Sequence, residues 1–215
     1  MNFEAITEYI PLYWKAMLLT LKIGWIGILL SIVIGFIAAL IRQHKIPVLS
    51  QFTRGYIELF RNTPLMVQLF FMYFALPRLG LPMNAESCGV LGIALFGGAY
   101  MAETVRSGIE AVDKGQMEGA LSLGFSPIRA EMYVILPQAV ATSVPAFTAN
   151  IIFLLKETSV FSAISLMDLM FTAKDLIGLY YKTTECLLLL VIFYLIILLP
   201  VSALGSVIEK KLRFV

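Results

Sequence analysis

The sequence contains few of the side chains that bind metal ions or form disulfide frameworks. Its 215 residues include two cysteines, Cys88 and Cys186, and one histidine, His44. No CxxC motif and no cluster of cysteine and histidine is present, so we expect no metal site. We expect both thiols to be free, because free cysteine is commonly buried, although a disulfide is geometrically conceivable in an oxidising compartment.

The sequence also lacks the motifs of common catalytic sites. It has no GxxxxGK[ST] phosphate-binding loop, no HExxH motif and no GxSxG motif. We therefore expect no catalytic residue and no cofactor bound by this chain. Any use of ATP would have to take place on another polypeptide.

Charged residues are scarce and hydrophobic residues are abundant. Only 14% of the residues are charged and 60% are hydrophobic, against about 25% and about 45–50% in a typical globular domain. Several apolar stretches reach the roughly 20 residues that cross a bilayer. Lipid offers the backbone no hydrogen-bond partners, which favours helices in such segments. The composition predicts an all-α integral membrane protein with one domain over residues 1–215.

Five apolar stretches predict five transmembrane helices. Prolines make two of them irregular, because Pro64 interrupts the second stretch and Pro137 and Pro145 lie within the fourth. The five predicted spans cover residues 13–41, 53–77, 88–110, 130–155 and 184–208.

Lysine and arginine are distributed unevenly between the two sides of these spans. One side carries Arg42, Lys45, Arg54, Arg106, Lys114, Arg129, Lys210, Lys211 and Arg213. The other side carries Arg78, Lys156, Lys174 and Lys182. Because cytoplasmic loops are enriched in both residue types, the N-terminus is predicted outside and the C-terminus in the cytoplasm. Residues 157–183 then lie outside, where we expect a short amphipathic helix at the membrane interface.

Polar residues in the second predicted span indicate a helix anchor or a polar path. Glu58 and Arg61 are three positions apart and share a helix face, so we expect them to form an ion pair. Pro64 leaves a carbonyl free in the preceding turn, and such groups are tolerated in membranes beside protein or water. The candidates to border a substrate path here are Asn62, Thr63 and Gln68.

Glu103 is a carboxylate within the apolar third span. A charge at the bilayer centre costs about 2.5 kcal/mol or more on insertion scales, so Glu103 must face protein or water. It either pairs with Arg106 or Arg61, or binds a cationic group of a solute. Tyr100 lies on the same helix face and is a second path candidate. Gly97 either allows close helix packing or borders the path.

Thr148 and Asn150 are polar candidates in the fourth span. Broken helices often line substrate sites in transporters, and an asparagine side chain both donates and accepts hydrogen bonds. This pair of properties suits a zwitterion such as an amino acid. The alternative for Asn150 is a helix–helix hydrogen bond, worth about 0.6 kcal/mol on average.

Residues 115–137 form a polar interruption on the predicted cytoplasmic side. We expect Gly115 to cap the third helix, because glycine adopts the left-handed conformation cheaply. A short helix is predicted over residues 117–123, with an apolar surface formed by Ala120, Leu121 and Leu123. Gly124 is expected to break it, and Pro127 to start the next helix. Two short helices in such a loop form a rigid knob suited to a groove on another protein. The alternative is an ordinary helical connection on the membrane.

Four stretches together resemble the permease subunits of polar amino acid ABC importers. They are residues 56–65, with the run Arg-Asn-Thr-Pro, and residues 98–109, 114–137 and 155–159. The resemblance covers nearly the whole chain. It implies a five-helix subunit in the bacterial inner membrane that dimerises around a translocation path, with a second copy or with a similar chain.

The resemblance also implies further partners. A coupling loop at about residues 115–129 would dock on a cytoplasmic ATPase subunit, one for each permease chain, that binds ATP and Mg²⁺. An extracytoplasmic binding protein would deliver the amino acid, and no nucleic acid is involved. The implied ATPase-coupling residues are Glu118, Gly119, Ala120 and Gly124. The family usually has Ala at position 119 and Ile at position 134, where this chain has Gly119 and Val134.

Two other functions are compatible with a five-span chain. The first is an ion-gradient-driven secondary transporter or channel subunit, although one short chain without an inverted repeat is unlike the usual transporter architecture. The second is a membrane scaffold with no transport role.

Overall fold

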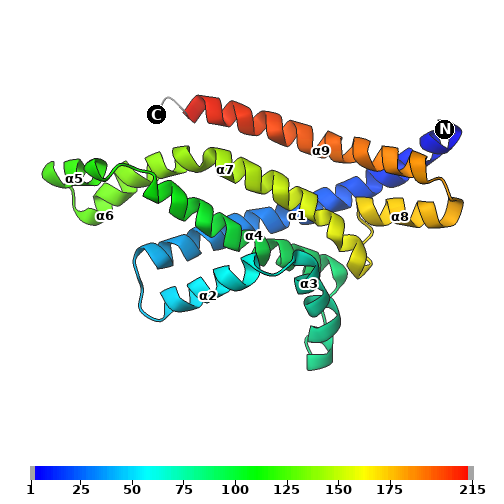
Figure 1. The fold of residues 1–215 in the computed structure, drawn as a ribbon, viewed down its shortest axis with the longest axis horizontal. Coiled ribbons are helices and arrows are strands. Elements are labelled where there is room, and N and C mark those ends of the chain that lie inside the picture. The colour runs from blue at the N-terminus through cyan, green and yellow to red at the C-terminus, as the bar shows by residue number, and fades with distance from the viewer. Residues whose placement is uncertain (1–2, 213–215) are drawn as a thin grey trace.

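The computed structural model describes residues 3–212, and this part of the chain contains helices and no strand (Figure 1). The long helices are α1 (Phe3–Gln43), α4 (Ala85–Glu110), α7 (Leu136–Glu157) and α9 (Thr183–Leu212). The shorter α-helices are α2 (Leu49–Arg61), α3 (Leu65–Phe70), α5 (Lys114–Ser122), α6 (Pro127–Ala130) and α8 (Leu169–Tyr180). Two π-helical turns, η1 (Phe71–Ala75) and η3 (Glu131–Ile135), and two 3₁₀ segments, η2 (Leu76–Leu79) and η4 (Thr158–Ile164), complete the described chain.

Four helical segments of the described chain are long and apolar enough to cross a bilayer. They are Ile6–Gln43, Ala85–Glu110, Pro127–Ile164 and Thr183–Leu212. These segments contain the first, third, fourth and fifth predicted spans. The prediction of an all-helical membrane protein is therefore confirmed.

The second predicted span differs from the structure. Helix α2 is amphipathic, with Thr53 and Ile57 buried and most of its other residues exposed. It ends at Arg61, and the apolar helical stretch begins only at Leu65 and runs to Leu79. Pro64 has no N–H with which to continue the helix, so the break was predicted, but the start of the apolar stretch at residue 53 was wrong.

Both π-helical turns lie just before a proline. The turn η1 ends two residues before Pro77, and η3 ends two residues before Pro137. A proline ring clashes with the carbonyl four residues earlier, and a widened turn is one way to relieve that clash. The predicted irregularity of the fourth span is therefore observed as η3 before Pro137. The irregularity predicted at Pro145 is wrong, because α7 continues through that residue as one α-helix.

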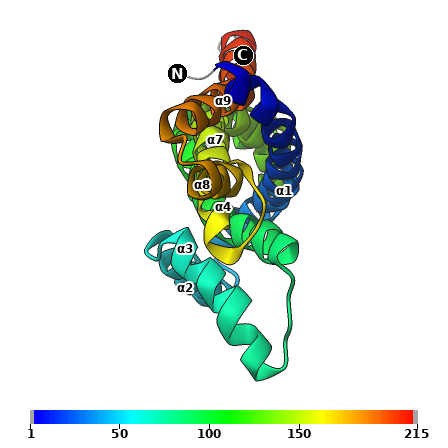
Figure 2. The same cartoon turned by 90° about the vertical axis from the view of Figure 1, so that its right-hand side faces the viewer.

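Helix α4 occupies the centre of the fold and packs against α1, α2, α3 and α7 (Figures 1 and 2). Glycines allow the closest approaches. A Cβ added to Gly35 of α1 would lie 2.4 Å from Met101 Cβ, and one added to Gly108 of α4 would lie 1.8 Å from Ser143 Oγ. Small residues allow membrane helices to pack tightly in this way. The segment from α3 to η2 extends away from this bundle (Figure 2).

The loops and helix termini lie at the two ends of the bundle in the two sets into which the lysine and arginine distribution divides them. Helices α5 and α6 lie at the same end as the last turns of α1 and α9, whereas α8 and the N-terminal end of α1 lie at the other (Figure 1). Arg213, one of the predicted cytoplasmic cations, lies outside the described residues. At the α8 end, Cys88 and Cys186 are buried free thiols, and Tyr13 donates a hydrogen bond of 2.7 Å to the Cys186 carbonyl.

Asp168 is a fully buried carboxyl at the start of α8, outside the spanning segments. Its Oδ1 accepts the Phe171 N–H at 2.9 Å, which caps the helix. Its Oδ2 has no hydrogen-bond partner among the described residues. Burial raises the pKa of Asp168 from 3.8 to about 7, against the opposing effects of backbone N–H donors and Lys174.

We expect the stability of the protein to fall as the pH rises from 4 to 8. The raised pKa means that the folded state binds a proton that the unfolded state has released over this range. The cost of ionising buried Asp168 reaches about 4 kcal/mol at most above pH 7. Asp168→Asn resembles the protonated side chain, so the variant should lose this pH slope and be more stable than the wild type at pH 8. Thermal unfolding in detergent at several pH values measures both effects.

Exposed Asp175 on the same helix provides a matched control. The Asp175→Asn variant should keep the wild-type slope. An Asp168→Asn variant whose unfolding temperature still falls between pH 4 and 8 as in the wild type would contradict this assignment.

Candidate functional site

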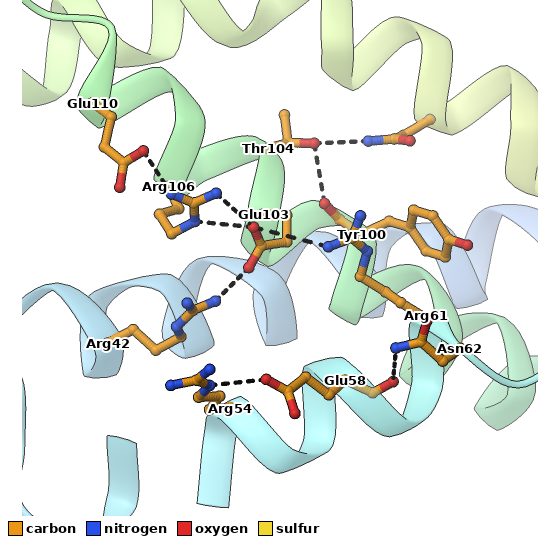
Figure 3. Close-up of polar contacts among 11 residues, drawn as sticks. Arg42, Arg54, Glu58, Arg61, Asn62, Tyr100, Glu103, Thr104, Arg106 and Glu110 are labelled. Atoms are coloured by element: carbon orange, nitrogen blue, oxygen red, sulfur yellow. Dashed lines mark hydrogen bonds and ion pairs between the residues drawn. The ribbon is translucent and has the colours of Figure 1, made fainter. Parts of the chain in front are cut away.

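Glu103 on α4 lies at the centre of a charged cluster that joins α1, α2 and α4 (Figure 3). Arg42 at the end of α1 donates from Nη1 to Glu103 Oε1. Arg106, one turn further along α4, donates to Glu103 Oε2 from Nε at 2.9 Å and pairs through Nη2 at 2.8 Å. Arg106 also bonds Glu110 at 2.6 Å. Both oxygens of Glu103 are thus engaged by guanidinium groups.

Arg61 at the end of α2 reaches the same cluster more loosely. Its Nη1 lies 3.9 Å from Glu103 Oε2, and its guanidinium carbon lies 5.4 Å from the centroid of the Tyr100 ring (Figure 3). Of the alternatives for Glu103, the structure shows ion pairing, closely with Arg106 and more loosely with Arg61. The predicted Glu58–Arg61 pair is wrong, because Glu58 bonds Arg54, four residues earlier on α2, at 2.8 Å.

These side chains surround a cavity of about 320 Å³ between α2 and α4. Its lining consists of Arg42, Arg54, Ile57, Glu58, Arg61, Asn62, Tyr100 and Glu103. The walls are predominantly polar, in contrast to the apolar cavity between α1 and α2, whose lining includes Ile37, Phe52 and Tyr56. A polar solute is the class of ligand that such a cavity can hold.

Polar side chains at the break between α2 and α3 donate hydrogen bonds to the backbone carbonyls around the break. Asn62 Nδ2 donates to the Glu58 carbonyl at 2.7 Å, and Thr63 Oγ1 donates to the Leu59 carbonyl at 2.8 Å. Gln68 Nε2 donates across the bend to the carbonyls of Phe60 and Thr63, both at 3.1 Å. Of these predicted path residues, Asn62 lines the cavity, while Thr63 and Gln68 stabilise the bend beside it.

Three other predicted path residues lie in helix–helix contacts rather than in the cavity wall. Asn150 Nδ2 donates to Thr104 Oγ1 on α4 at 2.7 Å. A Cβ added to Gly97 would lie 2.7 Å from Leu154 Cδ1, and one added to Gly205 would lie 2.1 Å from Thr148 Cγ2. The structure therefore favours the packing alternative for Gly97 and the interhelical hydrogen bond for Asn150.

The loop between α4 and α7 forms a second candidate site. Asp113 caps α5 by accepting the Gly115 N–H at 2.7 Å. Gly115 therefore lies in the first turn of α5, and its predicted role as the cap of the third span is wrong because α4 already ends at Glu110. Gly124 has a φ of +86° and separates α5 from α6, whose first residue is Pro127.

The predicted coupling residues divide into two groups in this loop. Glu118, Gly119 and Gly124 are exposed, whereas Ala120 is 5% exposed and packs inside the loop. Ala120 therefore holds the loop together and is not available on its surface, contrary to the expectation of an apolar outer face that includes it. Leu121 and Leu123 are exposed, the latter by 82%, and provide that face instead.

Most of the chain matches a known family in sequence. Residues 31–214 match the model of the binding-protein-dependent transport system inner membrane component. The chain belongs to this family. The inner membrane component is the membrane-spanning part of such a transport system, which agrees with the apolar helices and with the absence of a phosphate-binding loop from the sequence.

Relatives of this inner membrane component cover nearly all of the chain. The probable amino-acid permease protein YxeN of Bacillus subtilis is 34% identical over 214 residues, which are 98% of this chain and 96% of that protein. The probable glutamine ABC transporter permease protein GlnP of the same organism is 36% identical over 171 residues, 80% of this chain and 78% of the relative. A crystal structure of an amino acid ABC transporter with histidines superposes with a TM-score of 0.92 at 34% identity, over 98% of this chain and 99% of that one.

Arg42 is the ion-pair partner of Glu103 that sequence reasoning missed. The sequence identifies it only as a cytoplasmic flanking charge, yet it contacts Glu103 across 61 positions of sequence. The sequence does show a cation in the last turn of the first span, on the same side of the membrane as Glu103. It does not show which faces of α1 and α4 pack together, so the distance between Arg42 and Glu103 cannot be predicted from it.

Proposed function

We propose that this chain is the transmembrane subunit of an ATP-driven importer of a polar amino acid. The observation that carries the proposal is the full-length likeness, in sequence and in fold, to an amino acid ABC transporter. In this proposal α3 to η2 provides a fifth span, so the N-terminus lies outside and the C-terminus in the cytoplasm. The distribution of lysine and arginine supports this orientation.

The chain is proposed to act with three kinds of partner. A second copy, or a similar permease chain, completes the translocation path. A dimer of cytoplasmic ATPase subunits binds ATP and Mg²⁺, and an extracytoplasmic binding protein delivers the amino acid. The α5–α6 loop, about residues 115–129, docks on the ATPase through Glu118, Gly119, Gly124 and the exposed leucines, while Ala120 positions them.

The structure suggests how movement of the loop reaches the cavity. Gln138 of α7 donates to Gln116 of α5 at 3.3 Å, and Met117 packs against a buried cluster that includes Val105 of α4 and Ala139 of α7. Force on α5 would therefore be passed to α4, which lines the polar cavity, and to α7, which bonds α4 through Asn150. Closure of the ATPase subunits would rock α4 and α7 and alternate access to a site between the second and fourth spans.

The substrate path is proposed to include the polar cavity and the helix break beside it. Asn62, Tyr100 and Glu103 line the cavity itself. Thr63 and Gln68 shape its edge, and Gly97, Thr148 and Asn150 set the packing of the helices behind it. The cavity can hold a small polar solute, in agreement with a free amino acid as the transported species.

Uptake by the reconstituted complex tests this function. The chain would be placed in ATP-loaded proteoliposomes with its ATPase and binding protein, and uptake of labelled L-glutamine, L-histidine, L-arginine and L-aspartate would be measured. We expect uptake of at least one of these amino acids that unlabelled competitor abolishes. A complex that hydrolyses ATP but takes up none of them, while carrying a sugar or an inorganic ion, would overturn the proposal.

A further inference from the structure

Arg61 is the cation of the polar cavity that is least neutralised. Arg42 is bonded to Glu103, and Arg54 is bonded to Glu58 at 2.8 Å. Among the described residues, the ion-pair partner of Arg61 is Glu103, whose Oε2 lies 3.9 Å from Arg61 Nη1. Arg42 and Arg106 already bond that carboxylate. Arg61 therefore retains hydrogen-bonding capacity that Arg42 and Arg54 have used.

The cavity lining carries a surplus of positive charge. Three guanidiniums, those of Arg42, Arg54 and Arg61, face the two carboxylates of Glu58 and Glu103. A partly enclosed wall with one excess positive charge attracts anions. A cationic ligand group at Glu103 is disfavoured as well, because Arg42 and Arg106 already occupy both oxygens of that carboxylate.

The position of Arg61 suits a planar anion. Its side chain is 43% exposed. Its guanidinium carbon lies over the Tyr100 ring, 5.4 Å from the centroid, and a cation–π contact of this kind leaves the N–H donors available. A guanidinium fork matches the two oxygens of a carboxylate, and a bidentate pair is stronger and more directional than a single contact. Arg61 also immediately precedes the break at Asn62, so rearrangement of α2 against α3 would move it.

We infer that Arg61 is the residue that binds the α-carboxylate of the transported amino acid. This inference rests on the proposed importer function and names the group of the substrate that the cavity recognises. Tyr100 holds the guanidinium in place, and Arg42 and Arg106 keep Glu103 from neutralising it fully. In this arrangement Glu103 positions Arg61 and does not itself contact the substrate. Arg61 makes the contact.

Equilibrium binding to the purified permease–ATPase complex in nanodiscs, without the binding protein, tests this assignment. The probes are labelled L-glutamine and L-histidine and their α-carboxamides, in which the carboxylate is replaced by a neutral amide. We expect Arg61→Gln to weaken binding of the wild-type complex's preferred amino acid by about 10- to 100-fold, the range of a charged hydrogen bond. Binding of the corresponding α-carboxamide should change by less than about threefold.

Two further variants separate carboxylate recognition from general charge and from folding. Arg61→Lys keeps the charge without the fork, so it should recover part of the lost affinity for the amino acid. Arg54→Gln removes the same formal charge from the same cavity and should weaken binding by only about threefold. Size-exclusion profiles and unfolding temperatures of all variants verify that each complex is assembled.

The outcomes distinguish this inference from the proposed function. If Arg61→Gln weakens the amino acid and its α-carboxamide equally, Arg61 does not recognise the carboxylate and the inference is overturned. A wild-type complex that takes up L-glutamine or L-histidine yet does not bind that amino acid in nanodiscs also overturns it, while the importer function stands. Failure of uptake itself would instead reject the proposed function.

Discussion

Replacing Glu118 by Arg together with Gly124 by Val should reduce ATP-driven uptake by about tenfold or more, while the ATPase subunits continue to hydrolyse ATP. Glu118 is exposed on α5, and reversal of a charge at an interface costs several kcal/mol when it creates a like-charge contact. Gly124 has a φ of +86°, where a β-branched residue is strained by roughly 1–2 kcal/mol. A loss of 1.4 kcal/mol already lowers an equilibrium constant about tenfold. Parallel measurement of uptake and phosphate release in proteoliposomes reveals the uncoupling.

Gly55 provides a matched control for the glycine substitution. It is exposed on α2, and a Cβ added there meets no atom within 4 Å. Gly55→Val should therefore retain uptake. Coupled transport that is unchanged in the Glu118→Arg, Gly124→Val variant would contradict the role assigned to the α5–α6 loop.

Replacing Glu103 by Gln should destabilise the protein by roughly 2–4 kcal/mol, because it leaves partly buried guanidiniums without their counter-charge. The side chains of Arg42 and Arg106 are only 26% and 32% exposed. With their partner neutralised, these two groups and Arg61 repel one another across the junction of α1, α2 and α4. Uptake should fall by about tenfold or more, since the cavity loses its shape as well as its stability. Thermal unfolding and uptake are measured on the same preparation.

Glu86 is the appropriate comparison for Glu103, because it lies on the same helix and also forms an ion pair. Its bond to Lys22 spans 2.8 Å, but both side chains are more than half exposed. An exposed pair contributes about 0–1 kcal/mol, so Glu86→Gln should have little effect. Equal stabilities of the two variants would show that the Glu103 cluster contributes no more than a surface ion pair.

The long apolar helices were predictable because their signal is local. Hydropathy alone located α1, α4, α7 and α9 to within a few residues at most ends. Two prolines mark breaks that the structure shows: α2 ends three residues before Pro64, and Pro137 follows the π-turn η3. Pro145 marks no break, because α7 continues through it. Helix α2 was misassigned because its apolar face merges in sequence with the apolar stretch of α3, so a window over residues 53–77 averages an amphipathic helix with an apolar one.

The charged site was predictable only where sequence spacing fixes the geometry. The Glu103–Arg106 pair follows from a separation of three residues on one helix. The same rule gave the wrong partner for Glu58, because Arg54 and Arg61 both lie within reach of it on α2 and Arg61 is drawn towards Glu103 and Tyr100. Arg42 was missed because its contact depends on the packing of α1 against α4. That packing is set by glycines such as Gly35, whose spacing does not specify the partner surface.

The division of polar residues between structure and substrate path also required tertiary information. Asn150 and Thr148 have the chemistry of path residues, and their sequence positions are consistent with either role. Only the approach of α7 to α4 and α9 shows that Asn150 bonds Thr104 and that Thr148 abuts Gly205. Gly115 illustrates the same limit at shorter range, because Asp113 caps α5 and so places Gly115 in the first turn of that helix.

Dependence of uptake on ATP in the presence of ionophores tests the central claim most directly. Proteoliposomes containing the permease, its ATPase and its binding protein would be loaded with ATP or ADP and treated to collapse sodium and proton gradients. We predict accumulation of the labelled amino acid with ATP, unaffected by the ionophores, and none with ADP. Accumulation that requires an ion gradient and proceeds without ATP would contradict the account and identify the chain as part of a secondary transporter.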